Sequence, residues 1–92
     1  MKYKVSTTKR FDKALKKCIK RGLDMSILKT IILILEESGC LPAIYRPHKL
    51  VGKYVGLWEC HISPDWLLIW DQNDEELTLL FIDTGSYSDV FG

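Results

Sequence analysis

The chain has 92 residues, of which 47% are hydrophobic and 11% aromatic, a composition typical of a single small folded domain spanning residues 1–92 rather than of a disordered segment. No apolar run reaches the roughly 18 residues that a membrane-spanning helix needs, and the charged residues 1–5 are unlike a secretory signal. The cysteines, Cys18, Cys40 and Cys60, form no C-x-x-C pair, which favours reduced thiols in a cytoplasmic protein and argues against a disulfide framework or a zinc site.

The net charge of +1 hides an uneven distribution of charge along the chain. All 13 lysines and arginines lie within residues 2–53, which hold only four acidic residues and so carry a charge of +9. Residues 54–92 contain the other eight acidic residues and no lysine or arginine. Two interpretations fit: a basic face that binds a polyanion, or helices that simply carry solvated lysines.

The first predicted elements are a short strand at residues 3–6 and an amphipathic helix after it. The hydroxyl of Thr7 or Thr8 can cap this helix, because it can accept a hydrogen bond from a free amide of the first turn. Apolar residues recur at helical spacing, basic residues cover the outer face, and Gly22 suits the C-terminal end. The apolar positions are Phe11, Ala14, Leu15, Cys18 and Ile19.

A second helix is expected from its cap, Asp24, to Gly39. Its apolar side is broader than that of the first helix, which predicts deeper burial. Because the link between the two helices is short, an antiparallel two-helix hairpin is the simplest arrangement.

Residues 40–54 show little periodicity and contain two prolines and a glycine, so an ordered loop is expected. Aromatic and basic residues are interleaved in this loop, a pattern that favours contact with nucleic acid. They are Tyr45, Arg46, His48, Lys49 and Lys53. His48 alone fits a surface histidine equally well, and a functional role becomes favoured only if the loop folds toward His61.

Three strands are predicted in the rest of the chain, at residues 57–62, 66–70 and 77–83. The first two form a hairpin about Pro64, and a polar turn at residues 71–76 leads into the third, whose apolar sequence predicts a central position. Residues 84–92 are expected to form a turn or a short helical stub. The predicted fold is therefore a small α+β domain with an N-terminal strand and a two-helix antiparallel hairpin packed on one face of an antiparallel sheet.

The strand at residues 57–62 and the turn after it hold the candidate site. Because side chains alternate along a strand, Glu59 and His61 are expected on the face opposite the core-facing set Trp58, Cys60 and Ile62. The turn brings Asp65 and Trp66 beside His61, so that an imidazole, a carboxylate and an aromatic ring meet at one edge. A histidine at a strand boundary and an aspartate after proline are also ordinary structural residues, so both interpretations stay open.

Three motifs give the whole chain a resemblance to a known family. They are Pro42-Ala43-Ile44-Tyr45-x-x-His48-x-Leu50-x-Gly52-x-Tyr54-x-Gly56, then His61-x-x-Pro64-Asp65-Trp66-Leu67-Leu68-Ile69, then Thr84-Gly85-Ser86 with Phe91-Gly92 at the end. Together with the element order and the length, they resemble the YafQ branch of the RelE/ParE toxin superfamily. The resemblance implies a RelE-like fold and the toxin half of a bacterial type II toxin–antitoxin pair.

Toxins of this family enter the ribosomal A site and cut the mRNA there without a metal or other cofactor. The resemblance therefore implies a cytoplasmic, ribosome-dependent mRNA endoribonuclease that inhibits translation. Its partners would be the ribosome, mRNA and a cognate antitoxin that wraps and silences it in a hetero-oligomer, with no membrane involved.

The resemblance also assigns residues to the site, position by position. The positions matching active-site residues of the YafQ branch are His48, His61, Asp65, Trp66 and Phe91. The chain departs from the family at Tyr87, where that branch usually has histidine, and Tyr87 is assigned to the catalytic set. The basic loop adds Arg46, Lys49 and Lys53 as RNA-binding residues.

The expected chemistry is an attack of the ribose 2′-OH on its own 3′-phosphate, which needs a base, a group that stabilises the phosphorane and an acid. Histidine transfers protons near neutrality, and Asp65 can act as the base or hold the proton of His61. A cationic His48 suits the phosphate, and the rings of Trp66 and Phe91 offer faces on which a base can stack.

Two other functions stay open. A ParE-like toxin shares the fold and inhibits DNA gyrase by binding, but it does not need the set of His48, His61 and Asp65, which argues against it. The third possibility is a plain RNA- or protein-binding module. Mapping mRNA 5′ ends on translating ribosomes separates the three functions.

Overall fold

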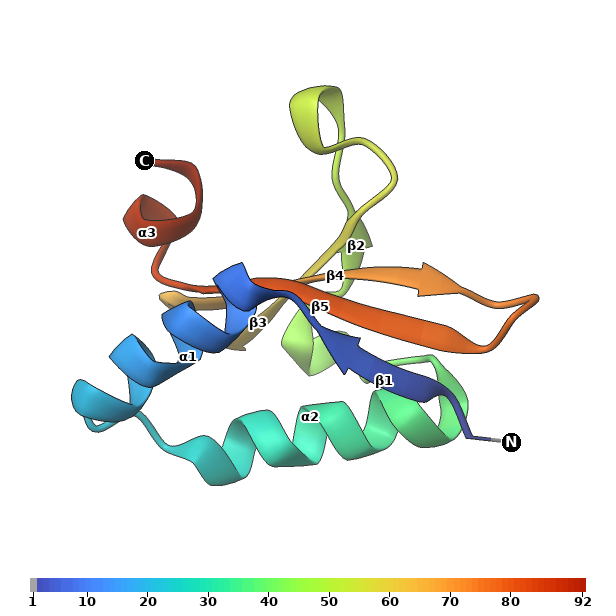
Figure 1. The fold of residues 1–92 in the computed structure, drawn as a ribbon, viewed down its shortest axis with the longest axis horizontal. Helices are drawn as coiled ribbons and strands as arrows, with labels where there is room; N and C mark the ends of the chain where they lie inside the picture. Colours follow the sequence, from blue (N-terminus) through green and yellow to red (C-terminus); the bar gives the residue numbers. More distant parts are fainter. Residues whose placement is uncertain (1) are drawn as a thin grey trace.

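A five-stranded sheet runs through the centre of the molecule, with its strands in the order β1-β5-β4-β3-β2 (Figure 1). The computed structural model describes residues 2–92. The strands are β1 (Lys4–Thr7), β2 (His48–Lys49), β3 (Trp58–Ser63), β4 (Trp66–Asn73) and β5 (Thr78–Gly85). β1 lies parallel to β5, and the other neighbouring strands are antiparallel.

The predicted α+β class is confirmed, but the expectation of a purely antiparallel sheet is wrong. The N-terminal strand pairs in parallel with β5, from Lys4 beside Thr78 to Thr7 beside Phe81. Most of the chain lies between these two strands, and a long connection allows two neighbouring strands to run in the same direction. A pairing between such distant residues leaves no local pattern, so the sequence alone did not indicate it.

Helix α1 (Lys9–Lys20) begins after Thr8, one of the two predicted caps. The hydroxyl oxygen of Thr8 accepts a hydrogen bond from the backbone amide of Phe11 at 3.0 Å. Phe11 and Cys18 are buried, and the Phe11 ring lies 5.7 Å from the ring of Phe81 in β5. These contacts fix α1 against β5 and leave its basic residues exposed.

Helix α2 (Met25–Ser38) is bounded by the residues predicted for its ends. Hydrogen bonds from the hydroxyl and the amide of Ser26 hold the pKa of the Asp24 cap below its usual value. Gly39 has a φ of 71°, a left-handed conformation that ends the helix without strain, and a Cβ there would lie 2.5 Å from the Tyr3 hydroxyl. Figure 1 shows α1 and α2 on the same side of the sheet and running in opposite senses, as predicted.

The hydrophobic core lies between the helices and the sheet. Its buried residues include Phe11, Leu28, Ile31, Leu35, Cys60, Ile62, Leu68, Trp70, Leu79 and Phe81. The predicted core face of β3 is confirmed, since Cys60 and Ile62 are buried and Trp58 is half-buried and stacked on Trp70. All three cysteines are free, and burial raises the pKa of the Cys60 thiol to about 12, which keeps it protonated and unreactive.

β3 and β4 form the hairpin predicted about Pro64. β4 continues to Asn73, beyond the predicted end at Trp70, because the backbone still pairs with β5 where the side chains become polar. The polar turn is correspondingly shorter than expected. No helix formed by residues 2–92 is both long and apolar enough to span a bilayer.

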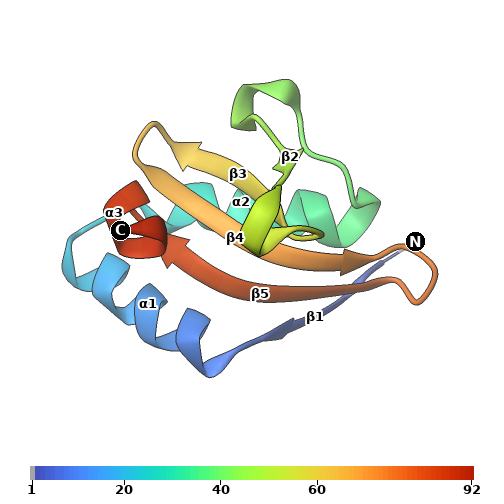
Figure 2. The ribbon, with the colours of Figure 1, turned by 90° about the horizontal axis from the view of Figure 1, so that it is seen from above.

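Two segments rise on the side of the sheet away from α2 and face each other (Figures 1 and 2). The first runs from β2 to a short 3-10 turn, η2 (Gly52–Tyr54), and the second is α3 (Tyr87–Phe91), the predicted helical stub. Another 3-10 turn, η1 (Ala43–Tyr45), precedes β2. The loop predicted at residues 40–54 thus contains a strand, which was missed because two residues are too few to show alternation.

Candidate active site

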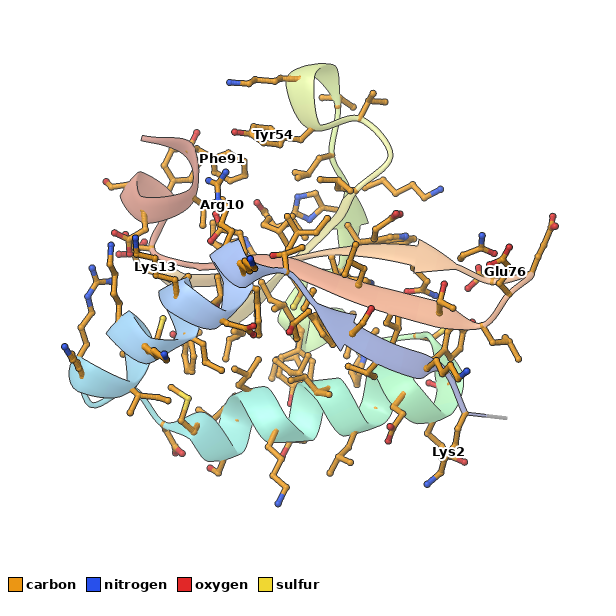
Figure 3. The ribbon with its side chains drawn as sticks, viewed as in Figure 1. Lys2, Arg10, Lys13, Tyr54, Glu76 and Phe91 are labelled. Carbon is orange, nitrogen blue, oxygen red and sulfur yellow. The ribbon has the colours of Figure 1, made fainter. Side chains whose placement is uncertain are left out.

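The candidate site lies between the η2 segment and α3, above the sheet. Figure 3 shows the side chains of Tyr54 and Phe91 pointing toward each other, with Arg10 beside them. The rings of Tyr54 and Phe91 meet edge to face at 5.4 Å, and the ring of Tyr87 lies 5.1 Å from that of Phe91. Tyr54 and Phe91 close over a small apolar hollow of about 50 Å³. The two segments therefore form an aromatic rim around the floor of the site.

Two histidines and a buried glutamate lie together on this side of the sheet. Nε2 of His48 lies 3.1 Å from Oε1 of Glu59, and Nε2 of His61 lies 3.9 Å from the same oxygen. Glu59 is only 6% exposed, whereas His48 is exposed and His61 is half-buried. The pairing of β2 with β3 sets His48 directly opposite Glu59, and strand alternation places His61 on the same face. The loop at residues 40–54 thus folds toward His61, which is the arrangement under which a functional role for His48 was expected.

Backbone carbonyls fix the orientation of both imidazoles. Nδ1 of His48 lies 2.9 Å from the carbonyl oxygen of Arg46, and Nδ1 of His61 lies 3.4 Å from that of Pro64. A carbonyl oxygen can only accept a hydrogen bond, so Nδ1 is the donor in both rings. Nε2 of each ring is consequently directed toward Glu59.

A cleft of about 400 Å³ opens beside His61, between η1 and the β3–β4 turn. Its lining consists of Ile44, Tyr45, Arg46, His61, Ile62, Ser63 and Pro64. Apolar, aromatic and cationic groups thus surround one imidazole, in a space of the size that small ligands occupy in proteins. This combination suits a nucleotide, with a base against the apolar wall and a phosphate near Arg46.

Asp65 lies at the β3–β4 turn, but its hydrogen bond leads to another element. Its Oδ1 accepts a hydrogen bond from the backbone amide of Tyr87 at 3.2 Å. Within residues 2–92 no hydrogen bond joins Asp65 to His61, whose ring is held by Pro64 and faces Glu59. Asp65 therefore connects the turn to the start of α3.

The expectation that the Trp66 ring offers a stacking face is wrong for this structure. Trp66 is only 2% exposed, and its Nε1 donates a hydrogen bond to Oγ1 of Thr84 at 2.9 Å. The register shifts between His61 and Ser63, so alternation across the turn does not carry Trp66 to the same face as His61. Phe91 is half-buried and Tyr87 is 65% exposed, so of the aromatic residues predicted for the site the two in α3 are accessible.

All three predicted RNA-binding cations are exposed: Lys49 and Lys53 lie in the η2 segment, and Arg46 directly follows η1. Nζ of Lys49 lies 5.7 Å from the centre of the Trp58 ring, and Nζ of Lys53 lies 5.7 Å from that of Tyr54. Both contacts have the geometry of a cation–π interaction. Arg46 lines the cleft next to His61, so one of the three reaches the imidazole site.

Three residues of the site were not predicted: Glu59, Tyr54 and Arg10. The alternation along β3 placed Glu59 on the face of His61, and a carboxylate between two core-facing residues was the signal that could have identified it. Arg10 comes from α1 and bonds Asp83, with Nη2 and Nε at 3.0 and 3.1 Å from Oδ2. It reaches the site only because α1 packs on β5, which no local pattern shows.

Within the part of the chain that the structure describes, no group of three or more His, Cys, Asp or Glu side chains is arranged to hold a metal ion.

Comparison with known proteins gives a consistent result. A family model described as a bacterial toxin of the type II toxin–antitoxin system, YafQ, matches residues 3–92. The chain is 36% identical over 83 residues to the mRNA interferase toxin YafQ of Escherichia coli K12, and the aligned segment covers 89% of this chain and 88% of the relative. The chain is also similar to several solved structures.

The crystal structure of YafQ from E. coli BL21(DE3) has a TM-score of 0.90 and 33% identity, and the match covers 98% of this chain and 99% of that one. YafQ in the E. coli DinJ-YafQ toxin–antitoxin complex has a TM-score of 0.90, 32% identity and full coverage of both chains. A metal-bound toxin from Helicobacter pylori has a TM-score of 0.87 and 35% identity, with 97% and 99% of the two chains covered.

A small α+β fold in which two histidines lie near one carboxylate, and one of them lines an open cleft, fits the class of compact bacterial toxins. The chain belongs to the YafQ family of toxins from type II toxin–antitoxin systems. The predicted family and the RelE-like fold are thereby confirmed.

Proposed function

We propose that this protein is an mRNA interferase, a cytoplasmic toxin that cuts mRNA in the ribosomal A site and so inhibits translation. The observation that carries the proposal is the convergence of the two histidines of the chain on Glu59, beside a cleft lined by aromatic and cationic groups. The activity named for the E. coli relatives supports the same conclusion.

In the proposed reaction the ribose 2′-OH attacks the adjacent phosphorus, giving a 2′,3′-cyclic phosphate and a leaving 5′-oxygen that takes up a proton. His61 is proposed as the base, because its Nδ1 donates to the Pro64 carbonyl while its Nε2, 3.9 Å from Glu59, has a free lone pair. His48 is exposed, and its Nε2 lies 3.1 Å from the Glu59 carboxylate; when it carries a second proton, it is suited to stabilise the phosphorane.

Tyr87 is proposed as the acid or as a hydrogen-bond donor to the phosphate. Its phenol is 65% exposed at the mouth of the site, and a phenol is protonated at neutral pH. Phe91, in contact with Tyr87 and Tyr54, offers the stacking surface for a base.

The ribosome is proposed as a required part of the reaction. His48, Asp65 and Tyr87 are all exposed, so the site itself encloses little of the RNA. In-line attack depends on holding the 2′-oxygen, the phosphorus and the leaving oxygen in one geometry, which an open surface does not impose. A ribosome that presents the codon in the A site would supply this constraint, with the basic residues of α1 and of the η2 segment on ribosomal RNA.

A cognate antitoxin is the second proposed partner. The DinJ-YafQ complexes show that E. coli relatives of this chain assemble with an antitoxin, which supports a hetero-oligomer here. A segment that covers the site would face Arg46, His48 and Lys53, so acidic and apolar residues are expected in it.

The test is a translation extract programmed with a defined mRNA, followed by mapping of new 5′ ends. The parent protein should produce 5′-OH ends within codons, and His61→Ala should lower the rate about 10²–10⁴-fold. Lys2→Ala is the control, because Lys2 lies far from the site (Figure 3). Intact mRNA with inhibited DNA gyrase would support a ParE-like toxin instead, and efficient cutting of purified mRNA would remove the ribosome from the mechanism.

A further inference from the structure

An ion pair between α1 and β5 holds a cation at the edge of the site. Nε of Arg10 donates a hydrogen bond to Oδ2 of Asp83 at 3.1 Å, and Nη2 lies 3.0 Å from the same oxygen. Oδ1 of Asp83 accepts a hydrogen bond from the backbone amide of Thr84 at 2.9 Å. Asp83 is 6% exposed, whereas 60% of the Arg10 side chain is open to solvent. A buried carboxylate of fixed orientation thus holds an exposed guanidinium.

The register of the sheet places this pair in line with the histidines. His48 lies opposite Glu59, and Glu59 lies opposite Ile69. Ile69 in turn lies opposite Asp83. Residues that face each other on neighbouring strands have their side chains on the same face, and strands lie about 4.8 Å apart, so the two carboxylates are roughly 10 Å apart on one face. The guanidinium therefore lies across the site from the imidazoles.

Arg10 also borders the aromatic rim. Figure 3 shows its side chain beside those of Tyr54 and Phe91, and all three line the apolar hollow of about 50 Å³. On the side of α1, Arg10 lines a second hollow of about 220 Å³ together with Lys13 and Lys17. The guanidinium thus lies between aromatic rings and further cations, a combination that suits single-stranded RNA.

We propose that Arg10 binds the RNA phosphate next to the scissile one, and that Asp83 is the positioning residue that holds the guanidinium there. The proposal rests on the proposed function, which brings RNA to this site. A guanidinium has five N–H donors in a planar fork, stays charged in proteins and matches the oxygens of a phosphate. Nε and Nη2 face Asp83, while Nη1 has no acceptor among residues 2–92. A base stacked on Phe91 brings its phosphate to this open edge of the fork.

Other contacts already attach the start of α1 to the sheet. The backbone amide of Thr8 donates to the carbonyl oxygen of Phe81 at 3.0 Å, and its hydroxyl donates to that of Ile82 at 3.0 Å. The ring of Phe11 packs against Phe81. An ion pair whose cation is open to solvent contributes little to stability. The guanidinium of Arg10 is therefore available for a ligand.

The first measurement needs no ribosome. Arg10, Arg21 and Arg46 are the only arginines of the chain, so ¹⁵N-arginine labelling gives an NMR spectrum with three Nε signals. The probe is a 2′-O-methyl RNA trinucleotide, which cannot be cut because it has no 2′-OH. We expect the Arg10 signal to move during the titration. The Arg21 signal is the internal control and should stay, because both oxygens of Asp89 already bind that guanidinium. An Arg10 signal that does not move overturns the proposal.

The second measurement compares variants by their affinity for the same trinucleotide. Arg10→Ala combined with Asp83→Asn removes both charges, so no buried carboxylate is left unpaired. We expect the double variant to bind about tenfold more weakly or worse, and the slope of log affinity against log salt concentration to fall by about 0.7, the value for one contact to a single strand. Arg10→Lys keeps a charge beside Asp83 but lacks the fork, and should lie between parent and double variant.

The double variant separates RNA binding from a purely structural ion pair. If the pair only held α1 in place, Asp83→Asn would recover what Arg10→Ala alone loses, because the unpaired carboxylate is gone. Parental affinity in the folded double variant therefore overturns the proposal. Lys2→Ala also removes one positive charge, far from the site (Figure 3), and should leave the affinity unchanged.

Cleavage on ribosomes is the third measurement. The double variant should lower kcat/KM about tenfold or more, mainly through KM, because a phosphate that does not react is bound equally in the ground state and the transition state. A fall in kcat alone would place Arg10 on the reacting phosphate and overturn the assignment to its neighbour. A parent protein that cuts no mRNA removes the proposed function, whereas the titration still decides whether Arg10 binds an RNA phosphate.

Discussion

The carboxylate of Asp65 and the backbone amide of Tyr87 are joined by a hydrogen bond of 3.2 Å. This bond ties the β3–β4 turn, which holds His61, to the first residue of α3. Backbone amides at the start of a helix favour a negative charge, so the contact is electrostatically suitable. The imidazole side of the site and the helix that carries Tyr87 and Phe91 are therefore held in one arrangement.

This contact predicts different effects for two substitutions of Asp65. Asp65→Ala removes the acceptor and should lower the cleavage rate on ribosomes about 10²-fold or more, because α3 loses its tie to the turn. Asp65→Asn keeps an acceptor oxygen for the Tyr87 amide but cannot act as a base, and should retain activity within about tenfold of the parent. An Asn variant as inactive as the Ala variant would show that Asp65 transfers a proton.

The hydroxyl of Tyr87 can be tested without removing its ring. Tyr87→Phe should lower the cleavage rate about tenfold or more, because the donor at the mouth of the site is lost. Tyr87→His should retain or raise the rate, since imidazole also transfers protons. The rate is measured by primer extension on cut mRNA, and a fully active Phe variant would limit Tyr87 to stacking.

Trp66 is expected to act through stability rather than through RNA. Trp66→Ala should lower the free energy of unfolding by about 3–5 kcal/mol, as for other buried aromatic residues. Trp66→Phe keeps most of the buried ring, loses the bond to Thr84 and should cost about 1 kcal/mol. Urea unfolding gives both values. Cleavage per folded molecule should be unchanged in Trp66→Phe, and a large loss there would restore a direct role for the indole.

The ion pair of Arg21 and Asp89 predicts a pH dependence of stability. Nη1 of Arg21 lies 2.6 Å from Oδ2 of Asp89, and this bond together with those from Ser86 holds the pKa of Asp89 well below its usual range. A lowered pKa in the folded state contributes stability above the ordinary aspartate pKa of about 3.9, and this contribution is lost as the pH falls below it.

Asp89→Asn should therefore lower the Tm at pH 7 and have a smaller effect near pH 2. Thermal unfolding followed by circular dichroism at several pH values measures this difference, and Asp71→Asn at an exposed position of β4 is the control. An equal loss of Tm at both pH values would mean that the charge of Asp89 is unimportant.

Ribosome binding should weaken with added salt, because lysines that contact phosphates release counterions on binding. Lys53→Ala should reduce the slope of log affinity against log salt concentration by about one, as expected for one lost phosphate contact. Lys2→Ala, at the other end of the molecule, should leave the slope unchanged (Figure 3). A flat salt dependence in the parent would argue against an electrostatic role for residues 2–53.

Local patterns predicted the helices, their caps at Thr8 and Asp24, the β3–β4 hairpin and the helical stub, because each depends on neighbours in the chain. The parallel pairing of β1 with β5 and the approach of Arg10 to Asp83 depend on packing between distant segments, and no local pattern indicates either. The alternation of side chains along β3 predicted that Glu59 and His61 share a face. His48 reaches the same carboxylate through β2, and a strand of two residues is too short to be recognised from its sequence pattern.

The parallel pair of β1 and β5 also has a consequence for biosynthesis. The ribosome synthesises a chain from its N-terminus, so β1 and α1 are made before β5, the strand against which both of them pack. α3, which carries Tyr87 and Phe91, follows β5 and is made later still. The nascent toxin therefore lacks both the complete five-stranded sheet and the aromatic rim of its site. We expect the chain to become active only after it has been released from the ribosome that makes it.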